Sequence, residues 1–65
     1  MITQSDLDHH LKRERQERAL AERASDPAVR KSHLDLAESH ARRAENAKAI
    51  LERQAESTQK RSLQI

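Results

Sequence analysis

The sequence predicts an all-α protein, an antiparallel helical hairpin whose helices span about residues 4–24 and 27–56. The first observation is that the chain has no glycine and a single proline, Pro27, which separates two long segments. Both segments are rich in Ala, Glu, Arg, Gln and Lys, a composition typical of solvated helices. Apolar residues in the second segment also recur with the α-helical period. Finally, aromatic residues and cysteine are absent, which excludes an aromatic core and disulfides.

The first helix has a clear start signal. Thr3 and Asp6 fit a capping box, in which the hydroxyl accepts from a helix amide and the carboxylate accepts from the cap amide. Ile2 and Leu7 occupy the two positions of a hydrophobic staple around this cap. The helix is therefore expected to begin at about Gln4.

Ser25 and Asp26 are expected to form the turn. Proline disfavours the helical conformation in the residue before it, so Asp26 should leave the first helix. Pro27 suits the first position of a new helix, and Asp26 can then act as its N-cap. The chain can reverse there without glycine. The alternative is one long helix that is kinked at Pro27.

The second helix carries the clearest apolar stripe. Steps of 100° per residue bring one set to a single face: Val29, His33, Leu36, Ala37, His40, Ala44, Ala47, Leu51 and Ala55. Residues 57–65 have no clear period and are expected to fray. One hairpin domain over residues 1–56, followed by a tail, is therefore predicted.

The unequal helix lengths predict a homodimer. With the turn at Ser25 and Asp26, Leu11 should meet His40 and Leu7 should meet Ala44. Beyond about Ala47 no first-helix residue is left to cover the second helix. A second chain is expected there, giving a four-helix bundle of two hairpins. The expected interface and core residues are Leu7, Leu11, Leu36, His40, Ala44, Ala47, Ile50 and Leu51.

The histidines allow three interpretations. His33 and His40 lie two turns apart on the apolar stripe, where each can pack with one ring nitrogen hydrogen-bonded. Alternatively, His10 and Glu14 could reach His40 across the hairpin and bind a metal ion. The third interpretation is pH sensing, in which acid weakens the dimer. The packing interpretation is preferred, and no cofactor is predicted.

Composition argues against several other functions. The run KRERQER at residues 12–18 has two glutamates among four cations, and no aromatic residue can stack on a base, which argues against nucleic acid. The chain lacks cysteine, tyrosine and a glycine-rich phosphate loop, so it is not expected to be an enzyme. No apolar run reaches the length of a membrane span, and residues 1–10 do not resemble a signal peptide. A cytoplasmic location is expected.

The segment ERALAERASDPAVRKSHLDLAESH resembles a pattern found in short uncharacterised bacterial proteins. In these, a helix rich in arginine and glutamate is followed by S-D-P and then by H-L-x-L-A-E. The matching residues are Glu17, Arg18, Ala21, Ser25, Asp26, Pro27, His33, Leu34, Leu36, Ala37 and Glu38. The resemblance implies an all-helical hairpin and no particular activity.

The sequence thus predicts a small non-enzymatic protein that acts by self-association and protein–protein contact, as an adaptor or regulatory module. Its partner is expected to be a second copy, with a different protein as a further possibility. Two alternatives stay open. One is a small regulator associated with nucleic acid, and the other is a metal-binding bundle that depends on His10, His33 or His40.

Overall fold

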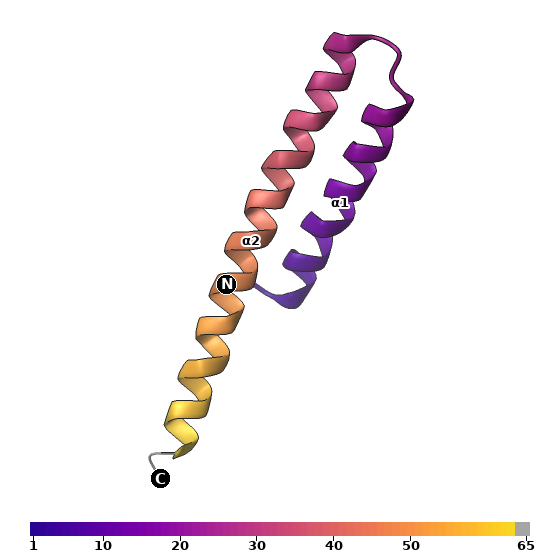
Figure 1. The fold of residues 1–65 in the computed structure, drawn as a ribbon. Coiled ribbons are helices and arrows are strands. Elements are labelled where there is room, and N and C mark those ends of the chain that lie inside the picture. The colour runs from indigo at the N-terminus through magenta and orange to yellow at the C-terminus, as the bar shows by residue number, and fades with distance from the viewer. Residues whose placement is uncertain (64–65) are drawn as a thin grey trace.

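The computed structural model describes the backbone of residues 1–63 and the side chains of residues 1–56. Two helices, α1 (Gln4–Arg23) and α2 (Pro27–Leu63), lie side by side and antiparallel (Figure 1). The predicted all-α class and helical hairpin are confirmed, and the alternative of one kinked helix is wrong. Helix α1 covers only the first part of α2, whose remaining part extends alone beyond the open end of the hairpin.

A capping box begins α1. The Thr3 hydroxyl accepts a hydrogen bond from the Asp6 amide at 3.2 Å, and the Asp6 carboxylate accepts one from the Thr3 amide at 2.8 Å. The Thr3 hydroxyl also donates to this carboxylate. These bonds favour the charged carboxylate, so they hold the pKa of Asp6 below its usual range, the backbone bond having the larger effect. The two residues predicted as a cap therefore fix the start of α1.

The turn reverses the chain without any left-handed residue. Helix α1 ends at Arg23, one residue before the expected end, and Ala24 is extended with φ −74° and ψ 125°. The Asp26 carboxylate then accepts from the Ala28 amide at 2.8 Å, which caps α2. Arg30 closes the turn, because its guanidinium donates a hydrogen bond to the Ala24 carbonyl. Residues 1–63 contain no positive φ, so glycine is not needed here.

Helix α2 is longer than the sequence analysis placed it. Its expected end at about residue 56 is wrong, because the backbone remains helical to Leu63. Residues 57–63 contain neither glycine nor proline, so they carry no signal that ends a helix. The absence of an apolar period in this segment means only that it has no packing face. Residues 57–63 of the tail that was expected to fray therefore belong to α2. Residues 64 and 65 lie outside the described part of the chain.

Small side chains form the seam between the helices. Residues at alternating spacings of three and four face each other, the pattern of coiled-coil packing. On α1 they are Leu7, His10, Glu14, Glu17 and Ala21, and on α2 they are His33, Ala37, His40, Ala44 and Ala47. Among residues 1–56, those buried outright are Glu17 and four alanines: Ala21, Ala37, Ala44 and Ala47. The core is therefore narrow and made mainly of methyl groups.

Three of the expected interface and core residues are not core residues within one chain. Leu36 is 47% exposed, Leu11 is 39% exposed and Ile50 is 36% exposed. The three-and-four spacing of the seam turns Leu11 and Leu36 to its flanks, because consecutive helical residues are 100° apart. Their place in an interface between chains stays a prediction. Leu7, His40 and Leu51 are half-buried.

Thr3→Ala is expected to lower the free energy of unfolding by about 1 kcal/mol, because an orphan amide of α1 loses its acceptor. Urea unfolding followed by circular dichroism measures this change. Ser5→Ala, at an exposed position two residues further along the chain, is the control and should leave the midpoint nearly unchanged. Equal losses in both variants would contradict the capping role of Thr3.

Ala37→Leu is expected to destabilise the hairpin by about 1–3 kcal/mol, because three extra carbon atoms overpack a seam in which Ala37 is fully buried. Ala49→Leu adds the same atoms at an exposed site of α2 and should have little effect. Thermal unfolding of both variants compares the two positions. A stabilised Ala37→Leu protein would show that the helices are not closely packed there.

Candidate functional site

A buried carboxylate lies in the seam near the turn. Glu17 is only 4% exposed, because α1 places it directly against α2. Its Oε2 accepts a hydrogen bond from His33 Nδ1–H at 2.7 Å, and its Oε1 accepts one from Arg13 at 3.0 Å. Both carboxylate oxygens are thereby satisfied, as burial of a charge requires. This layer links α1 and α2 through one charge-assisted contact.

Three imidazole rings converge at the other end of the seam. His10 Nδ1 of α1 lies 3.2 Å from His40 Nδ1 of α2. The His9 ring centre lies 5.3 Å from that of His10 and 6.4 Å from that of His40. Burial lowers the pKa of His40, and the nearby charges of His10, Arg13, Arg43 and His9 lower it further. The cluster is therefore a polar layer in an electropositive surrounding.

These contacts correct the expected pairing. Leu11 was expected to meet His40, but His10 does, and His33 meets Glu17. The opposed residues have numbers that sum to 50, whereas the sequence analysis assumed about 51. Leu11 lies outside the seam and is 39% exposed. Leu7 remains on the seam and is half-buried.

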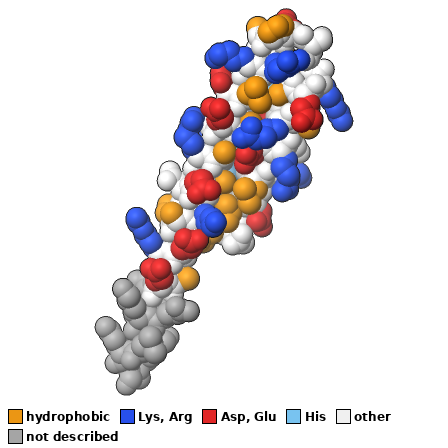
Figure 2. All heavy atoms as spheres, viewed as in Figure 1, with side chains coloured by type: hydrophobic (Ala, Val, Ile, Leu, Met, Phe, Trp, Pro, Cys, Tyr) orange, Lys and Arg blue, Asp and Glu red, His pale blue; other side chains and the backbone are white. Residues whose placement is uncertain are grey.

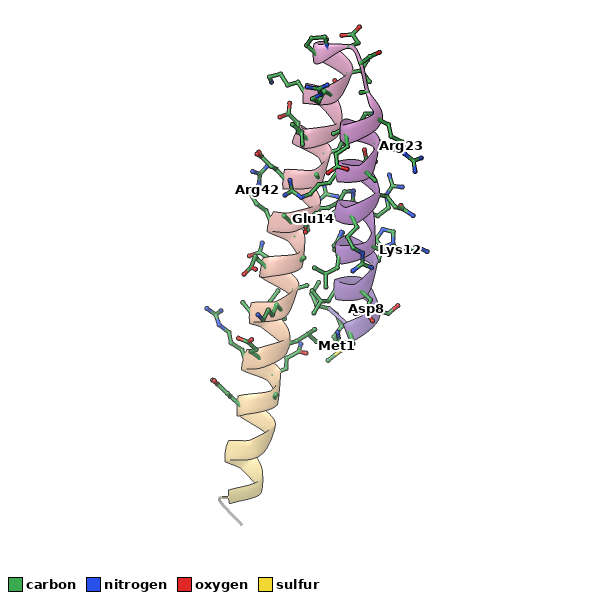
Figure 3. All side chains as sticks on the ribbon, turned by 45° about the vertical axis from the view of Figure 1, so that its right-hand side comes forward. Met1, Asp8, Lys12, Glu14, Arg23 and Arg42 are labelled. Atoms are coloured by element: carbon green, nitrogen blue, oxygen red, sulfur yellow. The ribbon has the colours of Figure 1, made fainter. Side chains whose placement is uncertain are left out.

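The metal group that was considered as an alternative is not assembled in residues 1–56. That alternative placed Glu14 with His10 and His40, but the Glu14 carboxylate accepts from Arg18 at 3.0 Å. Figure 3 shows Glu14 on the side of α1 that faces α2, whereas Asp8, Lys12 and Arg23 point away. Within residues 1–56, no group of three or more His, Asp or Glu side chains is placed to hold a metal ion.

Sequence reasoning missed His9 and Glu17 as members of these polar layers. A search for apolar periodicity gives no weight to glutamate. The signal that identifies Glu17 is its spacing, because it continues the three-and-four pattern from Leu7 to Ala21. His9 lies beside that pattern and carries no comparable signal.

Large aliphatic side chains lie on the outside of the hairpin. Val29, Leu36 and Ile50 are separated by whole heptads, so they line one side of α2. Leu34 contributes to an open groove of about 510 Å³, together with Arg18, Ala21, Glu22 and Arg30. On the face drawn in Figure 2, apolar side chains follow the line between the helices, flanked by charges of both signs. The exposed set is Leu11, Leu20, Val29, Leu34, Leu36 and Ile50, besides Met1.

Comparison with protein-family models, curated proteins and solved structures found no match to this chain. Neither helix, over its described residues, is long and apolar enough to cross a membrane. The two polar layers and the exposed aliphatic side chains are therefore the candidate functional features.

Glu17→Ala is expected to cost about 1–3 kcal/mol, because His33 and Arg13 lose their shared acceptor inside the seam. Asp35→Ala is the matched control: its carboxylate pairs with Lys31 on the exposed side of α2, where an ion pair contributes less than about 1 kcal/mol. Urea denaturation of both variants measures the difference. If Glu17→Ala is no less stable than Asp35→Ala, the buried layer does not hold the helices together.

Proposed function

We propose that the chain is a non-enzymatic interaction module that works by self-association, with two hairpins forming a four-helix bundle. The observation that carries this proposal is the distribution of apolar side chains. Alanines fill the seam, while Leu36, Val29 and Leu20 remain nearly half exposed. A hairpin that turns its large aliphatic groups outward has an unused apolar surface.

The energetics favour a second copy as the occupant of that surface. Fully burying a leucine, valine or isoleucine side chain contributes about 1.5–3 kcal/mol. The four buried alanines offer far less apolar area, and a chain this short has little other surface to bury. A second hairpin brings the same line of Val29, Leu36 and Ile50, so a two-fold contact is self-complementary.

The part of α2 beyond the open end supports the same proposal. Since opposed residues sum to 50, Thr3 at the start of α1 lies near Ala47. Ile50 and Leu51 follow directly, beyond the first residue of α1, Gln4. A partner helix along this segment would cover both side chains. The dimer is thus proposed to extend beyond the hairpin along α2.

The surface charges do not favour the nucleic-acid alternative. Arg13 is bound to Glu17, Arg18 to Glu14 and Lys31 to Asp35. Cations that are paired with carboxylates contribute less to a continuous positive field for phosphates. The mixture of blue and red side chains in Figure 2 is consistent with this. An adaptor or regulatory role in the cytoplasm, and kinship to the short bacterial hairpins, belong to the proposal.

Ile50→Glu is expected to weaken self-association by at least about tenfold, because a two-fold dimer loses the apolar contact of Ile50 twice and a total loss of about 1.4 kcal/mol already corresponds to tenfold. Sedimentation equilibrium over a concentration series measures the dissociation constant. Ala49→Glu, at the adjacent exposed residue, is the control.

A parent protein that stays monomeric at every concentration would overturn the proposal. So would an Ile50→Glu protein that associates as tightly as Ala49→Glu. A steep dependence of DNA or RNA binding on salt, without self-association, would instead support the nucleic-acid alternative.

A further inference from the structure

The histidine cluster joins the open end of the hairpin through an unusual contact. His10 of α1 and His40 of α2 approach through the same type of nitrogen, Nδ1, at 3.2 Å, and their ring centres are 5.4 Å apart. Two imidazoles can share such a hydrogen bond only if one nitrogen donates and the other is unprotonated. One added proton is tolerated, because a charged ring can still donate to a neutral one. A second proton leaves two donors facing each other.

The groups around this pair oppose a second proton. On α1, His9 and Arg13 lie beside His40, and on α2 Arg43 does so one turn away. All of these groups are cationic or can become so. In residues 1–56, no carboxylate is hydrogen-bonded to the His9, His10 or His40 ring.

The nearest acids of α1 have other partners. Asp6, one turn before His10, accepts from Thr3 in the capping box. Glu14, one turn after it, is paired with Arg18. Asp6 is close enough to His10 for a Coulombic attraction, but neither carboxylate forms a direct bond with the His10 or His40 ring.

The other polar layer responds to acid differently. His33 faces the Glu17 carboxylate at 2.7 Å, so a proton on His33 produces opposite charges across the seam. Acid thus introduces repulsion at the open end, between residues 10 and 40, while the layer near the turn keeps an attractive contact. The two ends of one seam differ in the sign of their response.

We propose that the His9–His10–His40 cluster is an acid-sensitive latch, which releases the first half of α1 from α2 while the turn end stays closed. Release exposes the methyl groups of Ala44 and Ala47, which are buried in the closed hairpin. This inference goes beyond self-association, because it concerns contacts within one chain.

The sign of the pH dependence follows from the environment of His40. Its pKa is lowered from the ordinary value of 6.5 in the folded hairpin, so the unfolded chain takes up the proton first as pH falls. The contact keeps its full stability above pH 6.5 and loses it as pH falls through the lower, folded value.

Distance measurement between paired spin labels tests the latch. The chain has no cysteine, so Ser5→Cys with Glu45→Cys labels the open end, and Ala19→Cys with Ala28→Cys labels the turn end. All four residues are exposed. Labelled protein is diluted with unlabelled protein, which removes distances between chains, and a chelator is present throughout. Between about pH 7.5 and 5, the open-end distance should lengthen and the turn-end distance should not change.

Two histidine variants identify the responsible group. His40→Gln should lose the pH-dependent lengthening, and His33→Gln should retain it. If His40→Gln does not fold at neutral pH, His10→Gln takes its place with the same expected loss. An open-end distance that is constant down to pH 5, or a lengthening lost only in His33→Gln, would overturn the latch. Sedimentation of the same samples reports self-association separately, so either proposal can fail without the other.

Discussion

The close contact of two helices through alanine is the constraint on which the other features depend. At Ala21, Ala37, Ala44 and Ala47 only methyl groups separate α1 from α2, so a leucine or isoleucine side chain would overpack these positions. Leucine and isoleucine are therefore displaced to the flanks, where they stay partly in water. A narrow seam of this kind also contributes modest hydrophobic stabilisation, because alanine removes little area from solvent on burial. The same residues that allow close approach thus leave the hairpin short of apolar burial.

The polar layers compensate for the low specificity of an alanine seam. Identical methyl groups in successive turns would allow α1 to slide along α2 with little loss of contact. The Glu17–His33 and His10–His40 contacts each form only in one register, since a shift by one residue turns the partners apart. A buried polar contact is a weak source of stability but a good determinant of register. Two such contacts, near opposite ends of α1, align the full overlap of the helices.

Local signals in the sequence predicted the starts of both helices, whereas contacts across the seam were less predictable. The Thr3–Asp6 box and the Asp26–Pro27 start depend on neighbouring residues alone, so the sequence contains all the information needed for them. The stripe on α2 placed Ala44 and Ala47 in the core. On α1, the register assumed from the turn misplaced Leu11, which is 39% exposed. The end of α2 was missed because helix continuation needs no apolar period.

Because the two helices of the hairpin differ in length, the direction and the length of the longer helix can vary separately. In a hairpin with helices of equal length these two properties are coupled. Residues 48–63 extend roughly 24 Å past the last contact with α1, at 1.5 Å per residue. This segment continues the part of α2 that packs against α1, so that packing sets its direction. Its own sequence is not constrained by packing against α1. Reach can consequently vary in whole helical turns through insertions near the carboxyl end, without disturbing either polar layer. The hairpin therefore fixes the direction of the C-terminal part of α2, whereas the length of that part can vary.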